Sequence, residues 1–172
     1  MTKRKGKYSN YELAFEAFLR QHQLLYLAIN EARRPIFRGR KVKNFDFIVV
    51  SKNKKLLLID IKGKQFPYES KIGKNYWENW ITKDDGVYLA QWSKVFHATA
   101  LLVYVYKIKY AADEALFDDL FRFKGKKYGL AAIEIGDYLK NAKPRSGKFK
   151  AISVSREKMP LLTKPISSFL KC

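Results

Sequence analysis

The sequence has almost no cysteine and almost no histidine. Among its 172 residues there is one cysteine, Cys172, and there are two histidines, His22 and His97. One cysteine cannot form an intrachain disulfide or a thiolate metal cluster, and neither histidine has a partner at ligand spacing. We therefore expect no disulfide framework and no Cys/His zinc centre, two structural histidines, and a reducing, cytoplasmic setting.

Long apolar runs are also missing. The longest, residues 98–106, is far shorter than the roughly 20 residues that a membrane-spanning helix needs. The basic segment at residues 1–9 is not followed by an apolar stretch of the kind found in a signal peptide. No basic amphipathic helix suited to a membrane surface is evident either. A soluble protein without a membrane partner is expected.

Acidic side chains are scarce relative to basic ones. The 35 Lys and Arg residues exceed the 16 Asp and Glu residues, which gives a formal charge of +19, and the basic residues are spread along the chain. A positive surface of this kind attracts polyanions, nucleic acid above all, because phosphate neutralisation supplies most non-specific affinity for it. The alternative is that the charge serves only solubility.

The chain contains enough apolar residues for the core of one α/β domain, since 47% of its residues are hydrophobic. We expect residues 1–8 to form a mobile basic arm and residues 9–172 to form the domain. Its predicted helices are 9–21, which starts with a capping box of Ser9 and Glu12, 84–96 with Asp84 and Asp85 at its N-cap, 137–142 and 166–171. The predicted strands are 24–30, 45–50, 56–61, 98–107, 120–123, 128–134 and 151–155, and residues 33–43 form a basic loop.

Two aspartates interrupt the most apolar pair of strands, 45–50 and 56–61. Alternation along a strand places Asp60 and Lys62 on one face. If the hairpin is symmetric about Asn53, Asp46 lies opposite Asp60, with Cβ atoms about 4.5–5.5 Å apart. Two such carboxylates repel each other unless a cation neutralises their charge, and one divalent cation could bridge both. The alternative is that Lys62 simply neutralises one of the aspartates.

The first helix offers further carboxylates. If this helix runs antiparallel to the strand that follows it, its start lies at the end of the sheet where Asp46 and Asp60 meet. Glu12 would then be close to the site, and Glu16, one helical turn or about 6 Å further along the axis, would be a weaker candidate. For Glu12 the alternative is the capping role, and for Glu16 it is a solvent-facing one.

These residues resemble a known superfamily. Asp46, followed 14 positions later by Asp60-Ile61-Lys62 and preceded by a helix carrying Glu12, resembles the motif of the PD-(D/E)XK nucleases, with Phe45 in place of the proline. More narrowly, residues 10–16, NYELAFE, resemble the signature of the uncharacterised HYExAFE family, with Asn10 in place of the histidine.

The superfamily resemblance implies both a fold and an activity. The fold would be a central mixed β-sheet flanked by helices, as in the restriction-endonuclease-like core. The activity would be hydrolysis of phosphodiester bonds with Mg²⁺ or Mn²⁺ held by Asp46 and Asp60, and by Glu12 or Glu16. Lys62 would position the attacking water. The implied partner is nucleic acid, DNA in preference to RNA, and a homodimer is left open. Oxygen-only ligands agree with the choice of metal.

Basic residues near the motif are candidates for binding nucleic acid. One group is interleaved with Tyr68, Tyr76, Trp77 and Trp80, as suits phosphate contact and base stacking, unless the tryptophans belong to the core. Two other functions stay open: a nuclease-fold binder without turnover, and a basic protein associated with ribosomal RNA that has no metal site. The candidate binding residues are Lys64, Lys71 and Lys74 after the motif, and Arg38, Arg40 and Lys43 in the basic loop.

Overall fold

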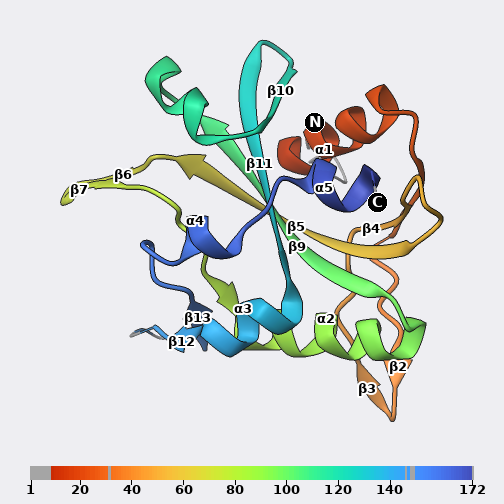
Figure 1. The fold of residues 1–172 in the computed structure, drawn as a ribbon. Helices are drawn as coiled ribbons and strands as arrows, with labels where there is room; N and C mark the ends of the chain where they lie inside the picture. Colours follow the sequence, from red (N-terminus) through yellow and green to blue (C-terminus); the bar gives the residue numbers. More distant parts are fainter. Residues whose placement is uncertain (1–8, 31, 146, 148–149, 172) are drawn as a thin grey trace, which may run out of the picture.

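A six-stranded mixed sheet forms the centre of the computed structural model, which describes residues 9–30, 32–145, 147 and 150–171 (Figure 1). The strand order is β1-β4-β5-β9-β11-β10, with β5 and β9 parallel and every other neighbouring pair antiparallel. The predicted arm at residues 1–8 lies outside the described residues. The strands are β1 (Leu25–Ala28), β4 (Phe47–Val50), β5 (Leu56–Phe66), β9 (Thr99–Ile108), β10 (Asp119–Phe123) and β11 (Lys126–Glu134).

Helices cover both faces of this sheet, as predicted. On one face α1 (Asn10–Gln21) and α5 (Ile166–Lys171) pack over β4, β5 and β11, and on the other α2 (Lys83–Phe96), α3 (Ile135–Asn141) and α4 (Met159–Leu162) cover the same strands. Among the described residues no helix is long and apolar enough to cross a membrane.

Strand β5 is buried on both sides because it lies in the middle of the sheet. Leu57, Ile59 and Ile61 join the core beneath α1, whereas Leu58 joins the core beneath α2. The dense apolar run in the sequence is therefore the pattern of a strand with two covered faces. The even-numbered residues of β5 face α2, which decides where Asp60 and Lys62 point.

The register of the central hairpin is the predicted one. Phe47 pairs with Ile59 and Val50 with Leu56, so the hairpin is symmetric about Asn53. Strand β5, however, extends to Phe66, beyond its predicted end at Ile61. The β4–β5 pairing reaches only as far as Ile59 of β5. The parallel pairing with β9 continues from Leu57 to Phe66, and its hydrogen bonds account for the longer strand.

The predicted N-cap of α2 is wrong by two residues. Thr82 is the N-cap, with an extended backbone (φ −73°, ψ 150°), and its Oγ1 accepts a hydrogen bond from the Asp85 N–H at 3.1 Å. A threonine hydroxyl three residues ahead satisfies that free N–H as well as an aspartate would. The Asp85 carboxylate is consequently released for other contacts.

Two segments expected to be irregular form small hairpins. In the basic loop, β2 (Ile36–Phe37) pairs with β3 (Arg40–Lys41) across a two-residue turn in which Arg38 and Gly39 have φ of 49° and 75°, as a tight hairpin turn requires. After β5, β6 (Tyr68–Ser70) pairs with β7 (Gly73–Asn75).

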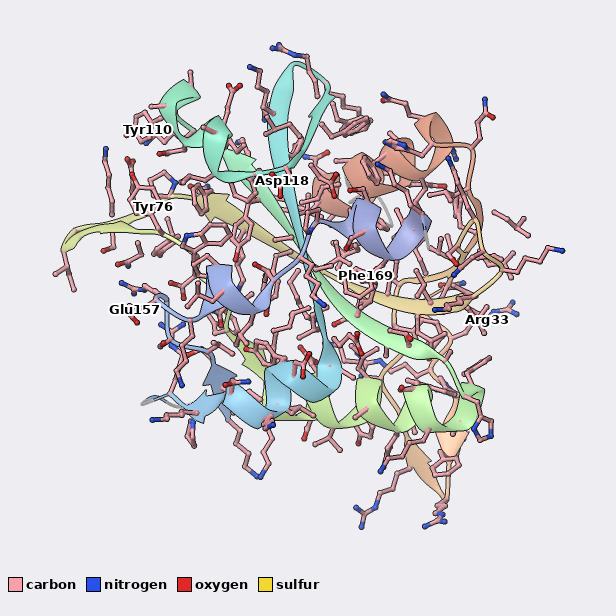
Figure 2. The ribbon with its side chains drawn as sticks, viewed as in Figure 1. Arg33, Tyr76, Tyr110, Asp118, Glu157 and Phe169 are labelled. Atoms are coloured by element: carbon pink, nitrogen blue, oxygen red, sulfur yellow. The ribbon has the colours of Figure 1, made fainter. Side chains whose placement is uncertain are left out.

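The β6–β7 hairpin is tied to the segment that follows β9. The Lys109 ammonium and the Tyr110 hydroxyl both contact the Glu69 carboxylate, and Lys74 Nζ lies 4.1 Å from the Tyr110 ring centre. Figure 2 places Tyr76 and Tyr110 on this same side of the molecule. The stretch after Lys62 is thus ordered by ion pairs and aromatic contacts.

The remaining elements lie at the edges. A small sheet joins β12 (Lys143–Pro144), β13 (Ala151–Ser153) and β8 (Ile81–Thr82), so the predicted strand 151–155 ends two residues early. A short 3-10 helix, η1 (Ala111–Leu116), connects β9 to β10. The predicted hairpin of β10 and β11 and the predicted helices α3 and α5 are confirmed to within two residues.

Candidate active site

Asp60 and Lys62 form an ion pair on the face of β5 that α2 covers. Lys62 Nζ lies 2.7 Å from Asp60 Oδ2, and Asp60 is buried, with 5% of its surface exposed. The pair lies within the sheet, where solvent screens charges weakly. Strand alternation predicted their shared face, and the structure brings them into contact.

A third charged residue, Asp85, comes from the first turn of α2. Its Oδ2 lies 3.1 Å from Lys62 Nζ, and its Oδ1 lies 2.5 Å from the Nζ of Lys43. Charges of alternating sign thus form one chain of contacts, which we call the charge network. It runs from Asp60 through Lys62 and Asp85 to Lys43. It links the central strand to the segment directly after β3.

Asp46 lies one residue before β4 and points at the backbone of β5. Its Oδ2 accepts a hydrogen bond of 2.5 Å from the Ile61 N–H, the amide of the peptide bond between Asp60 and Ile61. The hairpin register would place Asp46 opposite Asp60, but the hydrogen bonding changes here, because the Asp46 N–H donates to the Ile59 carbonyl at 2.9 Å. Two buried carboxylates are thus held beside one peptide of the central strand.

Burial and charge pull on the pKa values of this network in opposite directions. Burial raises the pKa of Asp60, and the neighbouring Lys62 and Lys43 offset this only in part. Burial also disfavours the charged forms of Asp85 and Lys62, but there the ion pairs prevail: Lys62 and Lys43 lower the pKa of Asp85, and Asp60 and Asp85 raise the pKa of Lys62. The network therefore favours the charged form of Lys62, whereas the burial of Asp60 is only partly offset by the neighbouring cations.

Lys64 continues the same face of β5. Its Nζ donates to the Trp80 carbonyl at 3.2 Å and lies 4.0 Å from the centre of the Trp80 ring. Burial, together with the positive charges of Lys62 and Arg145, lowers the pKa of Lys64 to about 8. Trp80 is 41% exposed, whereas Trp77 packs against the core ring of Phe66. Of these two tryptophans, Trp80 is the one with an exposed ring beside the network.

Glu12 and Glu16 are not brought to this network. Both lie on α1, which packs against the opposite face of β5. The Glu12 carboxylate accepts a 2.7 Å hydrogen bond from the Ser9 hydroxyl, and Glu16 pairs with Arg20 at 2.8 Å and accepts from the Tyr26 hydroxyl. The helix runs as predicted, but the sheet separates its acidic side chains from Asp60 and Lys62.

The basic candidates fall into two hairpins and the network. Arg38 and Arg40 belong to the β2–β3 hairpin, and Lys43, just after it, joins the charge network. Lys71 and Lys74 lie in the β6–β7 hairpin, and Lys64 lies on β5. In Figure 1 the two hairpins project from different ends of the molecule.

Divalent-cation chemistry fits the oxygen donors present here. Within the described ranges no group of three or more His, Cys, Asp and Glu side chains is placed to hold a metal ion. Mg²⁺, however, is commonly held by one or two carboxylates, with water and substrate phosphate completing its shell. Asp46 and Asp60 supply two carboxylates, and the uncompensated burial of Asp60 favours an added positive charge.

Asp85 is the functional candidate that sequence reasoning missed. The sequence pattern predicts a capping role for Asp85 together with Asp84, whereas the two residues have different environments: Asp84 is exposed and Asp85 is buried. The signal available was Thr82, three positions ahead, which can cap the helix by itself. If Thr82 is the cap, Asp85 has no capping role. A buried aspartate in the first turn then requires a cationic partner.

Comparison with known proteins adds evidence on the fold. No family model matches the sequence, and no curated protein sequence matches it. Among solved structures, the fold is similar to that of Hjc, a Holliday junction resolvase from the archaeal hyperthermophile Archaeoglobus fulgidus, with a TM-score of 0.56 and 12% identity over 93% of this chain and 97% of that chain. The narrower HYExAFE resemblance is unsupported. The chain therefore has the predicted α/β fold of the resolvase and restriction-endonuclease-like type.

Proposed function

We propose that this protein is a nuclease that hydrolyses phosphodiester bonds of DNA with Mg²⁺ or Mn²⁺ held by Asp46 and Asp60, beside the ammonium of Lys62. The observation that carries the proposal is the placement of two buried carboxylates and one partly buried ammonium around a single stretch of β5. The fold shared with a Holliday junction resolvase supports nucleic acid, and DNA in particular, as the substrate.

The aspartates and the lysine of the proposed site have separate roles. Asp46 and Asp60 would hold the cation, which when bound supplies charge stabilisation at the phosphoryl group and an acidified water. Lys62 keeps its proton and presents a fixed positive charge, because Asp60 and Asp85 hold its ammonium from two sides. A fixed ammonium beside the reacting phosphate stabilises the negative charge that develops during attack by water.

A nuclease-fold binder without turnover is the second candidate. It is favoured by one observation, the lack of a three-residue metal-binding group within the part of the chain that the structure describes. Against it stand two carboxylates buried close to the central strand, which would repel phosphate unless a cation were bound. A homodimer, which would let one assembly cut two strands, is a further part of the proposal that sedimentation can test.

The test is cleavage of labelled single- and double-stranded DNA and RNA with Mg²⁺ or Mn²⁺, by the wild type and by Lys62→Met. Cleavage of DNA by the wild type alone is the expected result. Equal cleavage by both proteins would overturn the assignment of Lys62. Binding without cleavage of any substrate would establish the second candidate.

Asp85→Asn is expected to lower kcat for DNA cleavage by about tenfold to a hundredfold, the usual effect of removing a group that orients a residue of the site. The substitution removes the charge that holds Lys62 and also releases Lys43, so KM for DNA should stay the same or fall. Asp137→Asn, at an exposed position of α3 outside the charge network, is the control and should leave both constants unchanged. A matching loss in the two variants would show that Asp85 does not position Lys62.

The pKa of Lys64, lowered to about 8, predicts a pH dependence of DNA binding. As pH rises from 7 to 9, Lys64 loses its proton, and one phosphate contact weakens with it, so the Kd should rise several-fold. Lys64→Arg keeps its charge over this range and should bind with a flat profile. Binding is measured by fluorescence anisotropy at constant ionic strength. Identical profiles for the two proteins would exclude Lys64 from the contact.

A further inference from the structure

The segment 33–43 forms a projecting ribbon of unusual composition, which we call the basic ribbon. Six of its eleven residues are Lys or Arg and none is acidic. Its two strands are joined by the tight Arg38-Gly39 turn, and it exposes two large apolar side chains, Ile36 at 71% and Phe37 at 44%. Cationic and apolar groups thus stand together on a narrow two-stranded element.

Both ends of the basic ribbon are fastened to the body of the protein. Val42 is buried, with 4% of its surface exposed, and the Trp92 indole N–H donates to the Lys43 carbonyl at 2.9 Å. At the other end the Asn44 side-chain amide donates to the Arg33 carbonyl at 3.1 Å. The ribbon is therefore held at its base, while residues 36–41 are exposed.

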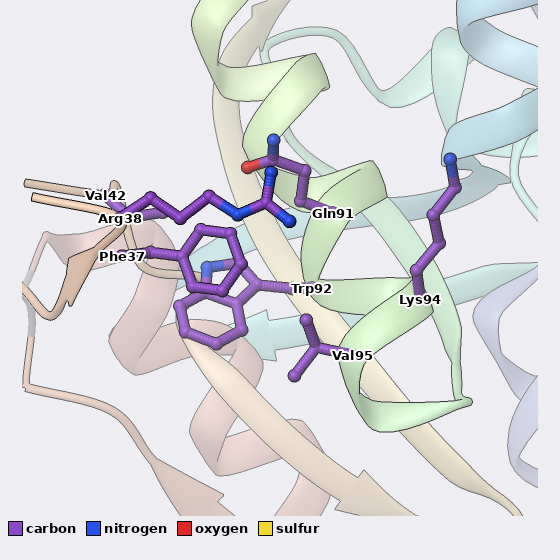
Figure 3. Close-up of a pocket in the computed structure, with 7 residues that line it drawn as sticks. All are labelled: Phe37, Arg38, Val42, Gln91, Trp92, Lys94 and Val95. Atoms are coloured by element: carbon purple, nitrogen blue, oxygen red, sulfur yellow. The ribbon is translucent and has the colours of Figure 1, made fainter. Parts of the chain in front are cut away.

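A cleft separates the basic ribbon from α2. It has a volume of about 300 Å³ and is lined by Phe37, Arg38 and Val42 of the ribbon and by Gln91, Trp92, Lys94 and Val95 of the helix (Figure 3). In Figure 3 the Arg38 side chain extends from the ribbon toward Gln91, while Lys94 points away from it. A second cleft, of about 460 Å³, adjoins it and includes Arg40, Asp84 and Tyr88. Apolar side chains and hydrogen-bonding groups thus together line the space beside the ribbon.

The basic ribbon is continuous with the candidate active site. Lys43, its last residue, pairs with Asp85, which in turn contacts Lys62. A polyanion bound along the ribbon would therefore meet the charge network where the ribbon ends. The basic ribbon and the charge network therefore lie on one continuous path for a bound polyanion.

A second hairpin in the same protein has nearly the same turn. Phe37-Arg38-Gly39-Arg40 is matched by Phe123-Lys124-Gly125-Lys126 between β10 and β11, with Lys124 and Gly125 at φ of 47° and 72°. In each turn the cation lies over the preceding phenylalanine ring, at 5.4 Å for Arg38 and 5.2 Å for Lys124. In Figure 1 the two hairpins lie at opposite ends of the molecule. The four turn residues are thus matched in charge and in turn geometry, and the β10–β11 turn is not part of the charge network.

We propose that the basic ribbon enters the major groove of duplex DNA and so sets the duplex against the charge network. The major groove of B-form DNA, about 12 Å wide, admits a two-stranded ribbon, whereas the deep major groove of A-form RNA does not. Arg38 and Arg40 would contact phosphates and base edges, and Ile36 and Phe37 would contact apolar edges such as thymine methyl groups. The inference rests on the proposed function only in taking DNA as the partner.

The test compares matched double variants for binding in a chelator, so that cleavage plays no part. For Arg38→Gln/Arg40→Gln we expect the Kd for a DNA duplex to rise at least about tenfold and the salt dependence to fall by about two charges. For Lys124→Gln/Lys126→Gln we expect less than a twofold change. Equal losses in the two variants, or equal losses on duplex DNA, duplex RNA and single strands, would overturn the proposal.

Chemical footprinting identifies the groove. Guanine N7 lies in the major groove and adenine N3 in the minor groove. The wild type should protect some N7 atoms from dimethyl sulfate, and the Arg38→Gln/Arg40→Gln variant should lose that protection at a protein concentration that saturates the duplex. Protection of N3 alone would refute entry into the major groove. Because both assays are independent of turnover, a failed cleavage experiment leaves their outcome interpretable.

Discussion

Asp60→Asn is expected to reduce the rate of DNA cleavage by at least about a hundredfold while leaving DNA binding equal to that of the wild type or tighter. A cation contributes several kcal/mol to stabilising charge at a reacting phosphoryl group, and about 1.36 kcal/mol corresponds to a factor of ten in rate. Asparagine keeps the size of the side chain but removes the charge that would hold the cation. Loss of a negative charge from a phosphate-binding surface favours binding.

The measurement separates chemistry from affinity. Single-turnover cleavage under saturating protein gives the rate, and anisotropy in chelator gives the Kd. Asp118→Asn, at an exposed position outside the network, is the control and should behave as the wild type. The Asp60→Asn protein should fold, because Lys62 keeps Asp85 as a partner, and circular dichroism checks this. Unchanged cleavage by folded Asp60→Asn would remove Asp60 from the site.

Gly63→Ala is expected to lower the free energy of unfolding by about 3 kcal/mol, at the upper end of the usual cost of overpacking. A Cβ at position 63 would lie only 2.2 Å from Cδ2 of Tyr11 and 2.3 Å from Cγ, so the ring or the start of α1 must move. The missing side chain at Gly63 is what lets α1 lie against β5. Urea denaturation of both proteins measures the difference.

Two further variants test the cause of this destabilisation. In a Tyr11→Ala background the added methyl group has room, so Gly63→Ala should cost much less there, and the double-mutant cycle should give a large coupling energy. Gly136→Ala is the matched control, because a Cβ at Gly136 would meet no atom within 4 Å. Additive effects of Tyr11→Ala and Gly63→Ala would contradict the proposed clash.

Short-range patterns account for what the sequence predicted correctly. Alternation along β5 alone places Asp60 and Lys62 on one face, and the polar turn around Asn53 sets the register that brings Asp46 near them. The Ser9 and Glu12 pattern likewise fixes the start of α1. Each of these features depends on residues within one turn or one strand pair.

Contacts between distant segments account for what the sequence missed. Asp85 reaches Lys62 because α2 crosses the even-numbered face of β5, and Glu12 and Glu16 are excluded because α1 covers the other face. Nothing within either helix specifies which face it will cover, since both helices carry an apolar stripe that could pack on either side. The basic loop forms a ribbon because Trp92 of α2 holds Lys43, and because the Asn44 amide holds the carbonyls of Asn30 and Arg33.

By itself the sequence determined the shared face of Asp60 and Lys62, the register of the hairpin that carries Asp46, the mixed sheet flanked by helices, and the positive charge that favours a polyanionic partner. The tertiary structure decided which other charges join the trio: it added Asp85 and Lys43, and it placed Glu12 and Glu16 behind the sheet. The physical reason is that strand alternation and turns act over a few residues, whereas the choice of face for each helix is a property of the whole core.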